Sequence, residues 1–224
     1  MSQRTIPARE RTRIDNILKI LEKTYPDAKV ALNFSNPLEM LVSTILSAQC
    51  TDERVNLVTK ELFKKYRSPQ DYANSDIGEL ERDIRSTGFY RAKARNIQKA
   101  SKLIVERFNS RVPKTMAELT TLPGVGRKTA NIVLSNAFGV VEGIAVDTHV
   151  GRVSKRLGFT KTEDPEKIEQ DLMRRVPRDL WFQFTYRLID HGRQTCTARK
   201  PLCGQCPLNK VCPSAFKFNQ RSNS

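Results

Sequence analysis

The residues best suited to chemistry lie in and just after the stretch Leu122–Ala130, which reads LPGVGRKTA. Its proline and two glycines predict a tight turn, because glycine reaches positive φ without steric cost. Leucines before the turn and apolar residues at helical spacing after it predict a helix on either side. Lys128 then falls in the first turn of the second helix. The positive end of the helix dipole and the adjacent Arg127 both disfavour its charged form, which would prepare a neutral amine as a nucleophile.

A second candidate is Asp147, within the sequence VDTH of residues 146–149. It precedes a helical run and is predicted to be an N-cap, a role that would by itself explain an aspartate at this position. A capped carboxylate also stays ionised, as a charge stabiliser should. An arbitrary lysine is more often solvated or paired with a phosphate, so Lys128 gains weight as a nucleophile only together with Asp147.

Four of the five cysteines form the array C-x6-C-x2-C-x5-C: Cys196, Cys203, Cys206 and Cys212. Four thiolates in such short loops can surround a zinc ion or an iron–sulfur cluster. Structural zinc usually uses two separated C-x2-C pairs, and the ferredoxin spacing does not match either. The array should first of all hold the end of the chain together, because metal-binding free energy becomes folding free energy. DNA contact through nearby cations and redox sensing are the further alternatives. Cys50, outside the array, is predicted to be a buried core residue.

The composition points to a polyanionic partner. The 224 residues contain 39 Lys and Arg against 24 Asp and Glu, which gives a net charge of +15. Backbone N–H groups at the turn near Gly124 and Gly126 are suited to a phosphate. Segment 87–114 adds eight cations and a single acid, Glu106, and we expect phosphate contacts there rather than only a solvated face. The cations are Arg91, Lys93, Arg95, Lys99, Lys102, Arg107, Arg111 and Lys114.

The elements that must position these residues are predicted to be helices throughout, because no stretch alternates convincingly with a period of two. The expected fold class is therefore all-α. Residues 1–13 are expected to form a disordered tail. The expected helices cover about 12–21, 37–46, 52–63, 77–84, 90–108, a pair flanking the turn at 123–126, a short one after 147, 165–176 and 178–191. Neither a membrane-spanning apolar run nor a signal peptide is evident, so we expect a cytoplasmic protein.

Through LPGVGRKTA, VDTH and the cysteine array, the chain resembles the endonuclease III family of helix-hairpin-helix DNA glycosylases from about residue 14 to 213. The resemblance implies that Lys128 attacks the deoxyribose C1′ of a damaged nucleotide and that Asp147 assists. It also implies that the four cysteines hold a [4Fe–4S] cluster. Two helical lobes with a cleft between them are expected, a central helical barrel at 30–142 and an iron–sulfur domain made of 1–29 plus 143–224.

The resemblance further implies which residues bind the partner, which is double-stranded DNA with a damaged base or an abasic site. Gln49 and Phe89 would fill the gap left by the flipped nucleotide, although the family often carries leucine where Phe89 stands. The remaining expected contacts come from the hairpin, from the region after Asp147 and from the cluster loop. These residues are Gly124, Val125, Gly126, Arg127, His149, Arg193, Arg199 and Lys200.

The function implied is removal of oxidised pyrimidines of the thymine glycol type, followed by strand nicking through β-elimination. The protein is expected to be a monomer that associates with a prokaryotic nucleoid. Adenine-mismatch glycosylases share the cysteine array but usually lack the lysine, whereas 8-oxoguanine glycosylases keep the lysine but lack the array. A non-catalytic iron–sulfur protein that binds DNA or senses redox state is the alternative from another class, and it would leave Lys128 and Asp147 unexplained.

Overall fold

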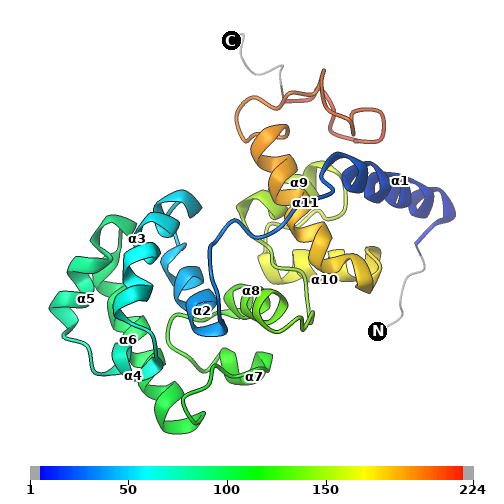
Figure 1. Cartoon of the computed structure of the whole chain (residues 1–224). Helices are drawn as coiled ribbons and strands as arrows, with labels where there is room; N and C mark the ends of the chain where they lie inside the picture. Colours follow the sequence, from blue (N-terminus) through cyan, green and yellow to red (C-terminus); the bar gives the residue numbers. More distant parts are fainter. Residues whose placement is uncertain (1–5, 219–224) are drawn as a thin grey trace. The chain divides into compact units, whose positions relative to one another are not determined.

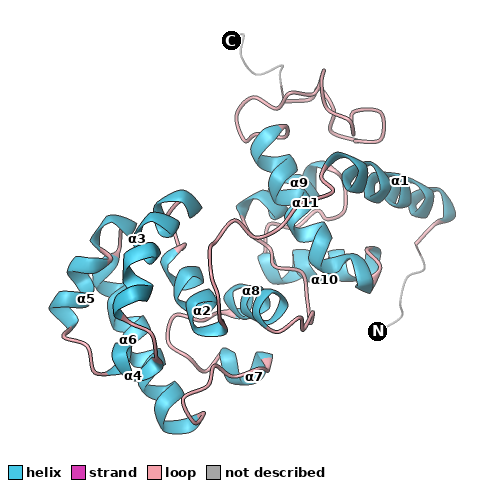
Figure 2. Ribbon diagram, viewed as in Figure 1, coloured by secondary structure: helices cyan, strands magenta, loops and turns pink. Residues whose placement is uncertain are grey.

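The computed structural model describes residues 6–218, which contain α-helices, two short 3-10 helices and no β-strand (Figure 2). The predicted all-α fold class is confirmed. No helix in the described part of the chain is long and apolar enough to cross a membrane. The chain divides into two compact units, one of residues 30–142 and the other of residues 1–29 together with 143–224.

Unit 30–142 contains the helices labelled α2 to α8 in Figure 1. Its buried apolar residues form one hydrophobic core. Asn36 caps its first helix through its side chain and Pro37 occupies the first helical position, both of which favour a helix start. The helix that follows, α2, is buried along most of its length and packs against α8. The helices of this unit are α2 (Pro37–Leu46), α3 (Asp52–Lys65), α4 (Pro69–Ala73), α5 (Ile77–Asp83), η1 (Arg85–Thr87), α6 (Tyr90–Arg107), α7 (Met116–Leu119) and α8 (Arg127–Ala137).

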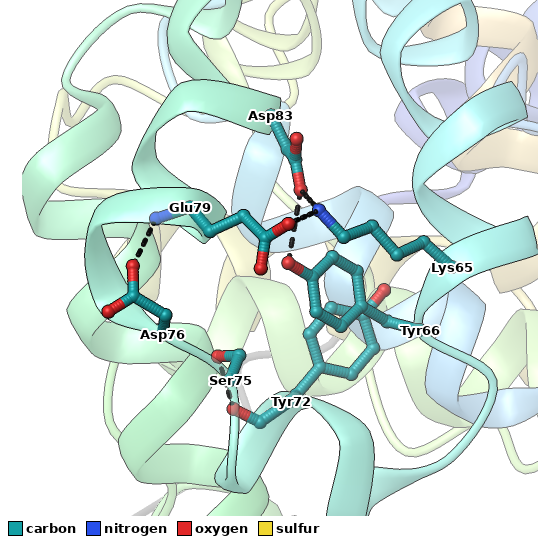
Figure 3. A network of polar contacts seen from close by, with 7 residues as sticks. All are labelled: Lys65, Tyr66, Tyr72, Ser75, Asp76, Glu79 and Asp83. Carbon is teal, nitrogen blue, oxygen red and sulfur yellow. Dashed lines mark hydrogen bonds and ion pairs between the residues drawn. The ribbon is translucent and has the colours of Figure 1, made fainter.

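A polar network ties α3 to α5 at the surface of this unit (Figure 3). Lys65 Nζ lies 2.6 Å from both Glu79 Oε1 and Asp83 Oδ2, and the Tyr66 hydroxyl donates to the same Asp83 oxygen at 3.0 Å. Hydrogen bonds to Asp83 and Glu79 raise the pKa of Lys65. Beneath them the Tyr66 ring stacks on Tyr72, with 4.9 Å between centroids. The network holds the helices that lead into the turn before α6.

The second unit has its own core, formed where α11 packs against α9 and α1. Phe159 and Phe184 meet edge to face in it, with centroids 5.5 Å apart, and both are buried. Trp181, Phe184 and Leu188 are core residues, as their helical spacing predicts. Its helices are α1 (Ala8–Thr24), α9 (Thr148–Arg156), α10 (Pro165–Arg175), η2 (Arg178–Leu180) and α11 (Trp181–Gln194), after which residues 195–218 form loops and turns (Figure 2).

Several local predictions were wrong. Helix α1 begins at Ala8, so residues 8–13 are helical, while residues 1–5 of the expected tail lie outside the described part of the chain. The sequence predicts Asp52 as the cap of α3, but the capping side chain belongs to Thr51, and Asp52 is the first helical residue. Cys50 is only half-buried and packs against the edge of the core. The short helix α4, capped by a reciprocal pair of Ser68 and Asp71, was missed because five residues are too few to show a periodicity.

Candidate active site and iron–sulfur centre

The predicted hairpin joins α7 to α8 and depends on Gly124. This glycine has φ of 80°, a conformation that costs an L-residue energy. A Cβ at this position would also lie 2.9 Å from the side chain of Asn96 on α6. The Val125 N–H donates to the Leu122 carbonyl at 3.1 Å and the Val125 side chain is buried, so this residue closes the turn from within.

Gly126 differs from Gly124 in conformation. Its φ is −89°, so the expectation that both glycines need positive φ was wrong for this one. It is the N-cap of α8, and within the described residues no side chain caps that helix. A Cβ at Gly126 would meet nothing within 4 Å. The N-terminus of α8 is therefore open, as a phosphate site requires.

Lys128 lies in the first turn of α8 and its side chain is exposed, as is that of the adjacent Arg127. Asp147 belongs to the other unit and is the N-cap of α9, as predicted from the sequence. Its Oδ1 accepts a hydrogen bond from the Val150 N–H at 2.7 Å. That bond fixes the carboxylate at the positive end of the α9 dipole.

His149 is the second residue of α9 and is half-buried. Its Nδ1 lies 3.1 Å from Arg152 Nη2, and the ring also has a hydrogen bond with the backbone of Gly192. Burial lowers the pKa of His149, and the charge of Arg152 acts in the same direction, whereas the charge of Asp147 raises it. His149 thus links the start of α9 to Gly192 of α11.

The four array cysteines are half-buried free thiols that line one cavity in the second unit. Apolar residues, among them Leu157, Leu202 and Leu208, complete its walls. Within residues 6–218, no three His, Cys, Asp or Glu side chains are placed to hold a single metal ion. Burial raises the pKa of the Cys206 and Cys212 thiols, and charge on the other cysteines acts in the same direction. Four thiolates here need a cationic partner, and a cavity ringed by sulfur with apolar walls fits an iron–sulfur cluster.

His191 forms another wall of this cavity and is fully buried. Its Nε2 lies 3.8 Å from Cys206 Sγ and its Nδ1 lies 3.1 Å from the Tyr25 hydroxyl. Burial lowers the pKa of His191 to about 4, so the imidazole is neutral at physiological pH. The sulfur of Cys206 therefore faces a dipole rather than a full charge on this side.

Two arginines of α9 that the sequence did not single out anchor the cysteine loop. Arg152 Nε donates to the Cys196 carbonyl at 3.1 Å. Arg156 Nη1 donates to the Thr197 carbonyl at 2.7 Å and lies 3.3 Å from Cys196 Sγ. Their positions one turn apart on a short helix would have suggested only solvated cations. Their loop partners are far away in sequence, so no local pattern indicated them.

The remaining predicted contact residues lie on the surface in two groups. Gln49 and Phe89 are exposed in unit 30–142, and both have positive φ, at 53° and 48°. Arg193, in the last turn of α11, and Arg199 and Lys200, in the loop between the first two cysteines, are exposed in the other unit. Of the eight cations in segment 87–114, seven are exposed, but Lys93 is buried and cannot contact a phosphate.

Comparison with known proteins identifies the family. The profile described as "HhH-GPD superfamily base excision DNA repair protein" matches residues 42–178. That described as "Iron-sulfur binding domain of endonuclease III" matches residues 196–212, which begin and end at cysteines of the array. The chain is 54% identical over 208 residues to endonuclease III of Synechocystis sp., covering 93% of this chain and 95% of that protein.

The chain belongs to the endonuclease III family. It is also 51% identical over 198 residues to the Bacillus subtilis endonuclease III, covering 88% of this chain and 90% of the relative. A solved structure of a non-covalent endonuclease III–DNA complex matches with a TM-score of 0.89 and 49% identity, over 92% of this chain and 97% of that one.

These findings confirm the predicted family and general function. The protein is a DNA glycosylase of base excision repair with AP lyase activity, and it binds DNA. The predicted [4Fe–4S] cofactor is confirmed as well, and the four cysteines around the cavity of the second unit are its candidate ligands.

Proposed function

We propose that this glycosylase/AP lyase removes oxidised pyrimidines of the thymine glycol type, with Lys128 as its nucleophile. The observation that carries the proposal is the exposed amine of Lys128 at the open N-terminus of α8, directly after the hairpin. The neutral form of this amine has the lone pair that a nucleophile needs. The open helix N-terminus beside it can hold a phosphate of the same strand.

The proposed reaction proceeds in two stages. Lys128 Nζ attacks C1′, the bond from C1′ to the base breaks, and the base leaves with the bonding electrons and takes up a proton. The C1′–O4′ bond then breaks, O4′ keeps its electrons and takes up a proton from the nitrogen, and the nitrogen lone pair forms the C=N bond of a Schiff base. A base then removes a proton from C2′, and the 3′ phosphate leaves with the electrons of the C3′–O bond. This β-elimination nicks the strand, and water releases the lysine.

Asp147 is proposed to stabilise the positive charge that develops on the sugar as the base departs. Its hydrogen bond from the Val150 N–H supports this role because it holds the carboxylate in one orientation. The cluster, held by Cys196, Cys203, Cys206 and Cys212, is proposed to stabilise the fold of residues 196–212. The cations Arg193, Arg199 and Lys200 beside or within that loop are suited to backbone phosphates.

Gln49 and Phe89 are proposed to fill the space that the damaged nucleotide vacates. Phe89 is 66% exposed, unusual for a large apolar side chain, and it follows Gly88 in a strained turn. An exposed aromatic ring can stack on the bases that remain. Gly124, Gly126 and Arg127 are proposed to hold the backbone of the same strand, with His149 as a further DNA contact.

The oxidised pyrimidine class has one further line of support among the solved relatives. A second match, with a TM-score of 0.89 and 49% identity, is described as a trapped endonuclease III–DNA covalent intermediate and an estranged-adenine complex. An adenine without its partner is what remains after a thymine-derived base is removed. Unit 30–142 is proposed to be the helix-hairpin-helix domain and the other unit the iron–sulfur domain. We further propose that the protein acts as a monomer on damaged DNA in the nucleoid.

Borohydride trapping on a duplex with one thymine glycol tests the nucleophile. Wild type should form a covalent protein–DNA adduct, and Lys128→Ala should form none, because alanine cannot make the Schiff base. Lys60→Ala is the matched control, since it removes another exposed lysine from a helix of the same unit. An adduct that persists in Lys128→Ala would refute the lysine assignment. If wild type traps an abasic duplex but not the thymine glycol duplex, the substrate class is wrong.

A further inference from the structure

Lys93 is a buried cation in the most basic segment of the chain. Only 4% of its surface is exposed, and no acidic side chain within residues 6–218 forms an ion pair with it. Its Nζ donates to the Leu46 carbonyl at 2.7 Å and to the Thr87 carbonyl at 2.8 Å. Burial lowers the pKa of Lys93, as expected for an ammonium group removed from water. Such a costly arrangement needs an explanation beyond packing.

The two carbonyls belong to the ends of two different helices. Leu46 is the last residue of α2, and Thr87 is the last residue of η1. Carbonyls at helix C-termini lack intrahelical partners and carry the negative end of the helix dipole. Lys93, itself in the first turn of α6, therefore caps both ends at once. Helix α6 contacts both elements within the same unit.

Each of the two capped ends leads directly into an exposed residue with a strained backbone. Gln49 follows Leu46 by three residues and has φ of 53°, and Phe89 follows Thr87 by two residues and has φ of 48°. Positive φ in a residue other than glycine persists only where the surrounding structure enforces it. The bonds from Lys93 to the two preceding carbonyls supply that constraint for both turns.

We propose that Lys93 is a positioning residue that joins the turns of Gln49 and Phe89, so that the two side chains enter the duplex as one rigid pair. The proposal rests on the proposed function, which gives Gln49 and Phe89 their role in filling the gap. An ammonium group suits the task because its three donors can reach acceptors on two elements. Lys93 acts through these two residues and does not itself contact DNA.

The test compares a reaction that needs a flipped nucleotide with one that does not. Lys93→Met keeps the apolar stem and removes the donors. Single-turnover excision of thymine glycol from duplex DNA should slow on the order of 100-fold, as expected when reacting groups are displaced by about 1 Å. β-Elimination on a single-stranded abasic oligonucleotide should stay within about twofold of wild type, because nothing has to be flipped there. Lys60→Met, on the exposed face of α3, is the control for loss of one positive charge.

A double-mutant cycle then asks whether Lys93 acts through the two turns. Added to Gln49→Ala/Phe89→Ala, the Lys93→Met change should slow duplex excision no further. If it multiplies the defect, if it slows both substrates equally, or if duplex excision by Lys93→Met matches wild type, the proposal is overturned. If Gln49→Ala/Phe89→Ala itself excises at the wild-type rate, the gap-filling roles in the proposed function fail as well. Should Lys93→Met not fold, Lys93→Gln, which keeps one donor group, undergoes the same comparison with a smaller expected defect.

Discussion

The two proposed catalytic residues lie at the N-termini of two helices, and these N-termini are capped in opposite ways. Gly126 is the N-cap of α8, and within the described residues no side chain caps that helix. Asp147 is the N-cap of α9, and its carboxylate accepts from the Val150 N–H at 2.7 Å. Both ends present the positive pole of a dipole. One remains available to an external anion, whereas the other is satisfied by an anion of its own.

This difference suits the charges that the reaction requires. The open end of α8 can accept a DNA phosphate beside Lys128. The closed end of α9 fixes the direction of the Asp147 carboxylate. The same backbone feature therefore leaves a site for an external anion in one unit and orients a carboxylate in the other. Adding a capping side chain to α8 should impair the phosphate site, and removing the cap of α9 should impair the orientation of Asp147.

The largest effect is expected from separating the charge of Asp147 from its capping bond. Asp147→Asn keeps an oxygen that can accept from the Val150 N–H but removes the charge. The rate of base excision should fall by roughly 10²–10³, the usual result of losing one electrostatic group in an active site. The melting temperature should change little.

Asp147→Ala is the matched variant because it removes both charge and cap. Its excision rate should fall as in Asp147→Asn. Its unfolding free energy should in addition be lower than that of Asp147→Asn by about 0.5–2 kcal/mol, because the helix loses its cap. Chemical denaturation and single-turnover kinetics measure the two quantities separately. Full activity in Asp147→Asn would show that only the cap matters.

A smaller effect is expected when the open end of α8 is closed. Gly126→Asp should stabilise the helix by roughly a few tenths of a kcal/mol, because aspartate is a slightly better N-cap than glycine. It should weaken binding to an abasic-analogue duplex by at least about tenfold, because a carboxylate near a phosphate repels it by about 1–4 kcal/mol at 4 Å. Gly126→Asn, a neutral cap, is the control. Equal affinity of the Asp and Asn variants would place the phosphate elsewhere.

The smallest effect distinguishes the two glycines of the hairpin by stability alone. Gly124→Ala should lower the unfolding free energy by about 1–2 kcal/mol, because alanine is strained at φ of 80° and its Cβ would lie 2.9 Å from Asn96. Gly126→Ala should cost only about 0.5 kcal/mol, through the weak capping preference of alanine. Denaturant titration measures both. Equal losses would contradict the different conformations of the two residues.

Much of the candidate site followed from local sequence rules. The turn at residues 123–126, the helix after it and the cap at Asp147 each depend on a few neighbouring residues, so their patterns were readable. The exposure of Phe89 followed from its place after Gly88 at a helix break. The cysteine spacing likewise indicated a metal or iron–sulfur site, because ligands in short loops are neighbours in both sequence and space.

The burial of Lys93 also had a local signal in the sequence. Lys93 lies four residues before the buried Ile97, on the apolar face of α6, so its helical position already indicated burial. Its charge and its seven cationic neighbours suggested the opposite. Periodicity was the better guide, because position on a helix decides which face a side chain occupies, whatever its charge.

Sequence alone determined that this is an all-helical DNA glycosylase of the endonuclease III family with a [4Fe–4S] cluster, four candidate cysteine ligands and a lysine at a helix N-terminus. Only the tertiary structure decided which distant groups those residues meet. It brought Lys93 to the carbonyls of Leu46 and Thr87 and Arg156 to the cysteine loop. The physical reason is that capping and turn formation involve adjacent residues, whereas a buried cation is satisfied by whichever acceptors the packing of separate helices brings within hydrogen-bonding distance.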